Sequence, residues 1–323
     1  MPLSQHLKSF SRLRTYKDCK KWFELTTYQT PHKPFLLLSI MDLIAEGFIA
    51  KNFIEPSFEL LDTFNTYWNS IMPLGSKTSM AYAFPRLKTD KFWHLIPNPG
   101  YENQINIDFS SMTRLREVCA GARMDDELFQ LMCNPETREQ LRAVLIKTYF
   151  APEIQSKVVG QGMVNYAAFQ YSIELLKVAE TKADFGPDKE ESEQKKKVRD
   201  QGFRKAIITL YSHRCALCGI RMLTPEGHTI VDAAHVKPWK DSYDDRPTNG
   251  MALCKLCHWS FDKGLMSVSK NYEVLVSKLV MVEQNYLGHI LTLTDRPIFT
   301  PEQESFWPAQ ENLHWHRKNT FRR

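Results

Sequence analysis

The sequence lacks any run of about 18 or more uncharged apolar residues, the length that a membrane-spanning helix needs. Its start, MPLSQHLKSFSRLR, has basic side chains but no apolar core of the kind that a secretory signal contains. It also has no internal repeat, and no low-complexity tract apart from one charged segment. The lack of a long apolar run and of a secretory signal argues against a membrane-spanning or secreted protein, and we expect a cytoplasmic one.

Disulfide bonds are not expected either, because cysteines in a cytosolic chain are usually thiols or metal ligands. Three of the seven cysteines are isolated in the sequence and should pack as small apolar residues: Cys19, Cys119 and Cys133. The other four form two Cys-x-x-Cys pairs with 35 residues between the inner cysteines: Cys215, Cys218, Cys254 and Cys257. Two such turns complete a tetrahedral zinc site. Because all four ligands come from the protein, the predicted zinc is structural and pins two distant loops together.

The net charge is only +5, but the positive charges are clustered along the sequence. Residues 1–23 contain six lysines or arginines against one acid, and the last ten residues contain four and no acid. Clustered cations beside a polyanion release counterions and so strengthen binding to nucleic acid without reading its sequence. The alternative for each cluster is a solvated basic face.

At 323 residues the chain is long enough for two domains. Residues 31–48 (PHKPFLLLSIMDLIAEGF) predict a buried helix that ends near Gly47, and residues 125–150 predict two amphipathic helices broken at Asn134-Pro135. Residues 91–109 are rich in Pro, Gly and Asn and predict short strands and turns. The N-terminal half is therefore mainly helical with a small β element.

A further helix is expected over residues 166–180, followed by the almost wholly charged residues 188–199. This stretch is either a solvated linker or an exposed helix with i,i+4 ion pairs, and it marks a domain boundary. Another helix, which begins near residue 202, leads into the first cysteine pair. The predicted fold class is α+β with two domains, and the boundaries are residues 1–158, a helix and charged linker over 159–199, and residues 200–323.

Three residues in the second domain suggest chemistry. His235, Asn249 and His258 are separated by 14 and 9 positions; the first two lie between the cysteine pairs, and His258 comes directly after the second pair. This order is the HNH, or ββα-metal, signature of nucleases. His235, on a strand, would take a proton from water, because a neutral imidazole is available near pH 7. Asn249 would hold the loop and orient the His235 ring through a hydrogen bond.

A divalent cation has candidate ligands in the same segment. His258 and Asp262 are i and i+4 on one helical face, so both can point at one ion. Many HNH sequences have an acid or His directly before the base, whereas Ala234 stands there in this chain. Positions 232 and 234 share a strand face, so we assign the further ligand to Asp232. The ion would be Mg²⁺ or Mn²⁺, and it would polarise the scissile phosphate and stabilise the departing 3′ oxygen.

Most of the chain outside the linker resembles known DNA-cutting proteins. The segments RDQGFRKAIITLYSHRCALCG, VDAAHVKPW and DDRPTNGMALCKLCHWSFDKGLMSVS resemble the HNH domain of bacterial restriction endonucleases that attack modified DNA, and ENLHWHRKNTFRR resembles the C-terminal end of that group. FSRLRTY, PHKPFLLLSIMDLI, FPRLKTDKFWHL and TRLREVCAGARMDDEL resemble the sulfur-binding domain of phosphorothioated-DNA-dependent restriction endonucleases. This second resemblance implies that residues 1–158 bind modified double-stranded DNA.

The resemblance also implies a phosphorothioate site, in which a shallow apolar pocket edged by cations receives the sulfur. Sulfur is larger, more polarisable and less strongly hydrated than oxygen, so apolar contact favours it while charge holds the anion. The matching positions are two residues beside the DNA backbone, four that form the apolar wall and two that supply guanidinium groups: His32 and Lys33; Tyr82, Ala83, Phe84 and Pro85; and Arg114 and Arg116. Family members often have a Tyr-Pro pair in the wall, whereas here Ala83 follows Tyr82 and the proline stands at 85. The loop is therefore shifted or the pocket differs.

We therefore expect a restriction endonuclease with a modified-DNA reader, a structural Zn²⁺, and an HNH domain that hydrolyses phosphodiesters with Mg²⁺ or Mn²⁺. One alternative keeps the nuclease but directs it to methylated DNA. Another is a catalytically inactive, zinc-dependent DNA-binding protein. The sequence leaves the oligomeric state open, a homodimer included.

Overall fold

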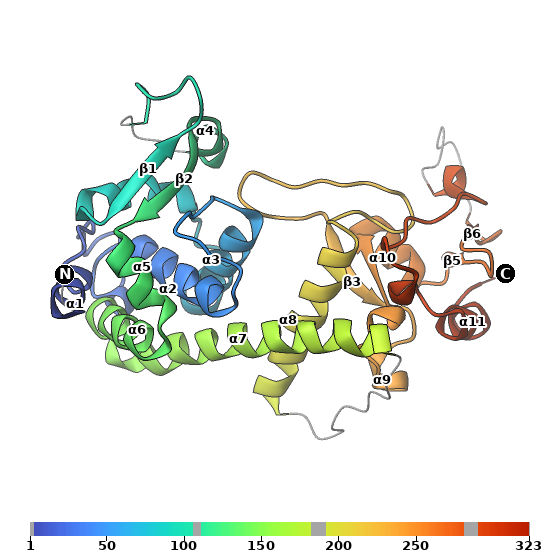
Figure 1. Cartoon of the computed structure of the whole chain (residues 1–323). Coiled ribbons are helices and arrows are strands. Elements are labelled where there is room, and N and C mark those ends of the chain that lie inside the picture. Colours follow the sequence, from blue (N-terminus) through green and yellow to red (C-terminus); the bar gives the residue numbers. More distant parts are fainter. Residues whose placement is uncertain (1–2, 106–110, 182–191, 281–289, 323) are drawn as a thin grey trace. The chain divides into compact units, whose positions relative to one another are not determined.

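The structure is a computed structural model, and it describes residues 3–105, 111–181, 192–280 and 290–322 (Figure 1). The chain separates into two compact units. Unit 1 comprises Met1–Tyr166 and Pro225–His228, and unit 2 comprises Ala167–Thr224 and Thr229–Arg323. Within the described stretches, no helix is both long enough and apolar enough to cross a membrane.

Unit 1 is mainly helical and has one pair of strands (Figure 1). Its helices are α1 (Leu3–Phe10), α2 (His32–Ala45), α3 (Phe58–Ile71), α4 (Met112–Val118), α5 (Asp126–Cys133), α6 (Pro135–Tyr149) and the first part of α7 (Pro152–Thr181). Its strands, β1 (Trp93–Pro97) and β2 (Cys119–Met124), pair antiparallel. Short 3₁₀ helices cover Glu24–Thr26, Met80–Tyr82 and Pro85–Asp90.

The core of unit 1 surrounds α2, which is buried along nearly its whole length and packs against α3 and α6. The predicted end of this helix is confirmed, because Gly47 follows it with a φ of 77°, a conformation that costs glycine little. The predicted break between α5 and α6 is also confirmed. The Asn134 side chain accepts hydrogen bonds from the backbone N–H groups of Glu136 and Thr137, and Pro135 begins α6. Strand β1 lies in the predicted β segment, whose end (106–109) is outside the described residues.

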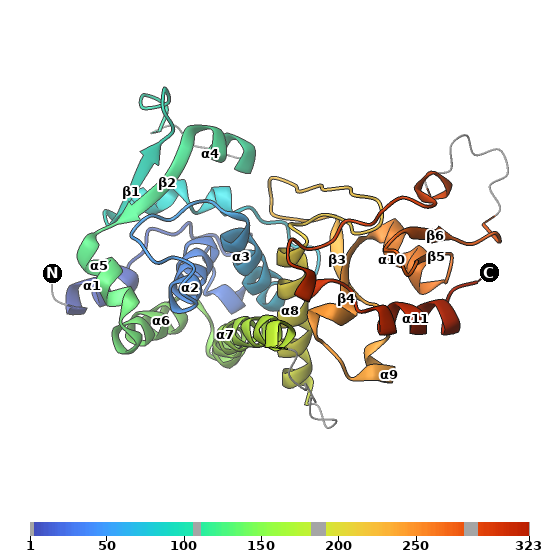
Figure 2. The same cartoon turned by 45° about the vertical axis from the view of Figure 1, so that its right-hand side comes forward.

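Unit 2 contains the rest of α7 and a set of shorter elements (Figure 2). They are α8 (Glu193–Leu210), β3 (Val231–His235), α9 (Trp239–Ser242), β4 (Gly250–Cys254), α10 (Lys255–Asp262), β5 (Met266–Val268), β6 (Val274–Val276) and α11 (Gln310–Asn319), with 3₁₀ helices at Pro247–Asn249, Leu291–Leu293 and Glu304–Phe306. Each of the pairs β3–β4 and β5–β6 is antiparallel.

The charged stretch before the cysteines is helical over its described part. Ser192 caps α8 by accepting a hydrogen bond from the backbone N–H of Lys195, and Glu193 pairs with Lys197 at 3.0 Å. The exposed-helix alternative is therefore correct from Glu193 onward, and residues 188–191 lie outside the described part. Helix α7 also extends well beyond the predicted 166–180, since it begins at Pro152.

A ββα unit forms the centre of unit 2. In the β3–β4 pair His235 lies opposite Gly250, and Val231 lies opposite Cys254, after which α10 begins at once (Figure 2). A side chain at Gly250 would collide with Ile207 of α8. Glycine at this position therefore lets α8 pack closely against the strand pair, which brings α8 side chains to His235.

Candidate active site

His235 is the last residue of β3, and its side chain is 21% exposed. Its Nε2 atom lies 2.7 Å from Oδ1 of Asp245. The ring stacks on Phe203 of α8, with centroids 4.0 Å apart and planes within 7°. The predicted base therefore lies on a strand, as expected. Its Nε2 atom contacts Asp245, and the face of its ring stacks on Phe203.

Asp245 was not identified from the sequence, although its carboxylate is within hydrogen-bonding distance of the His235 ring. Its side chain has no exposed surface. Its second oxygen, Oδ2, accepts a hydrogen bond from the Tyr171 hydroxyl at 2.9 Å and lies 3.7 Å from Nε of Arg199. The only sequence signal is an acid pair, Asp244-Asp245, between His235 and Asn249.

Asn249 holds the loop after β3, as predicted, but the predicted hydrogen bond to the His235 ring is wrong. The fully buried amide donates to the carbonyl oxygens of Lys237 at 3.0 Å and Asp244 at 2.9 Å. Its Oδ1 atom accepts from the Lys237 backbone N–H at 2.9 Å. These bonds tie the two ends of the loop together, and the contact with the ring is made by Asp245 instead.

His258 and Asp262 share one face of α10, as the i,i+4 spacing predicts. The distance between His258 Nε2 and Asp262 Oδ2 is 3.6 Å, and the two side chains are 29% and 59% exposed. A histidine nitrogen and a carboxylate oxygen that face solvent at this separation fit two ligands of one divalent cation.

Asp232 does not join this pair in the structure. Its carboxylate is paired with the ammonium group of Lys255 at the start of α10. Among the described residues, the one group of three or more His, Cys, Asp or Glu whose ligand atoms lie within 4.8 Å of one another is the cysteine group. Positions 232 and 235 also lie on opposite faces of β3, because side chains alternate along a strand. The assignment of Asp232 as a ligand therefore stays a prediction that the geometry does not favour.

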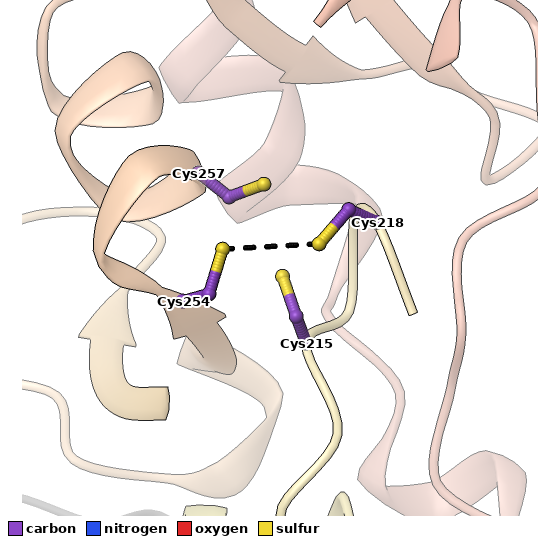
Figure 3. Close-up of side chains that lie close together, drawn as sticks. All are labelled: Cys215, Cys218, Cys254 and Cys257. Carbon is purple, nitrogen blue, oxygen red and sulfur yellow. Dashed lines mark hydrogen bonds between the residues drawn. The ribbon is translucent and has the colours of Figure 1, made fainter. Parts of the chain in front are cut away.

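The four paired cysteines converge on one point, as Figure 3 shows. Cys215 and Cys218 come from the turn after α8, while Cys254 ends β4 and Cys257 lies in α10. Their sulfur atoms all lie within 4.8 Å of one another, and those of Cys218 and Cys254 are 3.7 Å apart. Hydrogen bonding with the Cys218 thiol lowers the pKa of Cys215. Four soft sulfur donors with no further ligand position fit a structural zinc ion.

In unit 1, His32 lies in an aromatic cluster. Its ring centroid is 4.7 Å from that of Trp68 and 5.5 Å from those of Trp22 and Tyr82. Nδ1 contacts the Thr30 hydroxyl at 2.6 Å, and the buried Nε2 has no hydrogen-bond partner. Burial lowers the pKa of His32 to about 4, so the ring is neutral near pH 7.

Lys33 is also buried, and its ammonium group is paired with Asp90 at 2.5 Å and contacts the Thr89 hydroxyl at 3.0 Å. Burial lowers the pKa of Lys33, and the Asp90 carboxylate opposes this shift. The positive charge of Lys33 is thus already neutralised by a neighbour.

The expected apolar wall divides into one exposed and three buried residues. Tyr82 is 45% exposed, whereas Ala83, Phe84 and Pro85 are buried, and Phe84 packs edge-on against Trp93. Ala83 and Phe84 belong to the hydrophobic core of unit 1, and Pro85 begins the second of the two 3₁₀ helices. Of these four, Tyr82 presents substantial surface to a ligand.

Arg114 and Arg116 both lie on α4 and both have partners within unit 1. Arg114 pairs with Glu117 at 2.7 Å and donates a hydrogen bond to the side chain of Gln104. Arg116 Nε donates to the carbonyl oxygen of Pro56 at 3.0 Å. Helix α4 packs against the 3₁₀ helix Met80–Tyr82, so these cations and Tyr82 belong to adjoining elements.

Comparison with known proteins identifies a segment that lies mostly in unit 2. Residues 215–269 match the family described as HNH endonuclease. Among solved structures, the chain is similar to one titled "Modification dependent TagI restriction endonuclease", with 20% identity over 36% of this chain and 36% of that chain and a TM-score of 0.26. The match thus spans little more than a third of that protein. A search of curated proteins gave no match. The family match confirms the predicted HNH endonuclease domain.

Proposed function

We propose that this protein is a modification-dependent restriction endonuclease that hydrolyses DNA phosphodiester bonds in its HNH domain. The observation that supports the chemistry most strongly is the placement of His235. Its ring is held at the end of β3 by Asp245 and Phe203, within the segment that matches HNH endonucleases. A histidine with one ring nitrogen engaged and the other available is suited to general-base catalysis.

In the proposed hydrolysis, different residues of the chain have different roles. His235 takes a proton from the attacking water, and Asn249 closes the loop that follows β3. His258 and Asp262 would hold Mg²⁺ or Mn²⁺. When bound, that cation polarises the scissile phosphate and stabilises the charge that develops on the departing 3′ oxygen. The sulfur group of the four cysteines would hold Zn²⁺ as a structural ion.

For unit 1 we propose a role as a reader of phosphorothioated double-stranded DNA. The half-exposed Tyr82 beside the neutral His32 offers an aromatic, weakly hydrated contact of the kind that suits sulfur. Arg114 and Arg116 on the adjoining α4 would supply positive charge near the backbone. We also assign the protein to the cytoplasm, with DNA as its partner and no membrane association, and the proposal admits a homodimer.

A digestion panel tests this proposal. Plasmids of one sequence, prepared phosphorothioated, methylated or unmodified, are incubated with the full chain and Mn²⁺, with EDTA as the negative control. Cutting of the phosphorothioated plasmid alone supports the proposal. Cutting of the methylated plasmid alone supports a methyl-directed nuclease, and cutting of all three contradicts modification dependence. Binding without cutting in any arm would indicate an inactive DNA-binding protein.

A pair of arginine variants tests the reader separately. Arg116→Ala should weaken binding to a phosphorothioated duplex by about tenfold in a fluorescence anisotropy titration, because a cation beside the backbone is lost. Arg123→Ala is the control, since Arg123 is an exposed arginine paired with Asp126 on a neighbouring element. Equal affinities of both variants and the unaltered chain would show that Arg116 does not contact the modified DNA.

A further inference from the structure

The carboxylate of Asp245 makes its contacts in one buried network. One oxygen meets His235 Nε2 at 2.7 Å, and the other receives the Tyr171 hydroxyl at 2.9 Å with Arg199 Nε at 3.7 Å. A carboxylate with no exposed surface is costly to ionise unless such partners stabilise it. Asp245 thus connects residues of α7, α8 and β3 at the ring of the base.

The partners of Asp245 determine which nitrogen of His235 carries the proton. Burial and the Asp245 carboxylate both raise the pKa of Tyr171, so this hydroxyl stays protonated and is the donor to Oδ2. An ionised carboxylate only accepts hydrogen bonds, so His235 Nε2 must donate. In the neutral ring Nδ1 then has the free lone pair.

The ring is also restrained against turning over. Phe203 lies parallel to it at 4.0 Å between centroids, and an in-plane hydrogen bond to Asp245 fixes its edge. Asn249, the residue that the HNH pattern suggests for this task, uses its amide on the loop carbonyls instead. Orientation of the ring therefore depends on Asp245.

We propose that Asp245 is a positioning residue of the nuclease site, which holds His235 as the Nε2–H tautomer so that Nδ1 is the atom that takes the proton from water. This inference rests on the proposed role of His235 in DNA hydrolysis. The competing interpretation is that Asp245 only anchors the loop between His235 and Asn249. That role would not require a defined tautomer of the ring.

Asp245→Asn separates the two interpretations because it keeps the size of the side chain but lets the amide donate as well as accept. In Mn²⁺-dependent plasmid cleavage we expect kcat to fall by on the order of 100-fold or more while KM changes by less than about threefold, because ring orientation matters in the transition state. Asp244→Asn is the matched control on the same loop. Its carboxylate contacts Arg246 at 2.9 Å and not His235. We expect this control to cleave as the unaltered chain does.

Long-range ¹H–¹⁵N NMR spectra of the zinc-loaded full chain, with His235 signals assigned by their absence in His235→Ala, give the tautomer directly. We expect Nε2–H in the unaltered chain and a mixture of tautomers in Asp245→Asn. An Nδ1–H ring in the unaltered chain overturns the proposal, as does unaltered cleavage by Asp245→Asn. Tyr171→Phe, which keeps the carboxylate, should retain the Nε2–H tautomer. If Asp245→Asn does not fold, the spectrum of the unaltered chain still decides. If the unaltered chain cuts no DNA, the proposed function fails while the spectrum still tests Asp245.

Discussion

The ammonium group of Lys255, at the start of α10, neutralises the carboxylate of Asp232 on the neighbouring strand β3. A carboxylate already paired with a lysine is a poorer cation ligand than one that faces solvent beside a histidine, as Asp262 does. The structure thus favours α10 over β3 as the source of the proposed catalytic metal ligands.

This relationship predicts different effects for two aspartates. Asp262→Asn should lower Mn²⁺-dependent cleavage by on the order of 100-fold, because a charged ligand is lost. Asp232→Asn should change it by less than about threefold, because it removes mainly an exposed ion pair. Initial rates measured over a range of Mn²⁺ concentrations compare the two. If Asp232→Asn lost more cleavage activity than about threefold, the result would support Asp232 as a metal ligand.

Replacement of the base should separate cutting from binding. His235→Ala should abolish detectable cleavage, because it removes the proposed general base, while leaving affinity for DNA within about twofold. Gel assays of cleavage and anisotropy of binding measure the two properties. His314→Ala, which alters an exposed histidine on α11, is the control for loss of an imidazole. Residual cutting by His235→Ala would show that His235 is not the general base.

Loss of one zinc ligand should destabilise unit 2. Cys257→Ser should reduce bound zinc from one ion per chain to near none, and the midpoint of thermal unfolding should fall by more than about 10 °C, because a structural zinc contributes folding energy directly. Elemental analysis and calorimetry measure these effects. Cys133→Ser, at an exposed cysteine of α5, should keep the zinc. Equal zinc content in both variants would contradict a four-cysteine site.

Acid should destabilise unit 1 through His32. Its pKa is about 4 in the folded chain, against about 6.5 in an unfolded one. Between these values the unfolded chain binds more protons, so the free energy of unfolding falls as the pH drops from about 6.5 to about 4 and then levels off. At pH 4.5 we expect a loss on the order of 2 kcal/mol. His32→Phe keeps a ring beside Trp68 and cannot titrate, so it should lose correspondingly less between pH 7 and pH 4.5 in urea titrations followed by fluorescence. An identical pH dependence in both proteins would argue against His32 as the source.

The parts of the fold that the sequence predicts are those set by local chemistry. Asn134 caps α6 and Pro135 occupies its first position, while Gly47 follows the end of α2, so these boundaries follow from neighbouring residues. The i,i+4 relation of His258 and Asp262 follows from helical periodicity in the same way.

The parts that sequence reasoning missed depend on contacts between distant residues. Asp245 meets Tyr171, 74 positions away, and no periodicity connects the two. The pairing of Asp232 with Lys255 requires the junction of β4 and α10 to lie beside β3. The burial of Phe84 depends similarly on Trp93 and the surrounding core. Such relations are properties of tertiary packing, so spacing alone does not reveal them.

Zinc bound by the four cysteines would also affect the order in which the nuclease domain folds. Strands β3 and β4 join His235 to Gly250, and β4 then ends at Cys254, which shares its site with Cys218. The segment between Cys218 and Cys254 must be closed into a loop before β3 and β4 can pair. Loop closure costs conformational entropy, and such closures slow folding. An ion held by both cysteine pairs would close that segment before the strands pair. A newly synthesised chain would therefore become able to cut only after it has acquired zinc, and comparing refolding rates with and without Zn²⁺ would measure that delay.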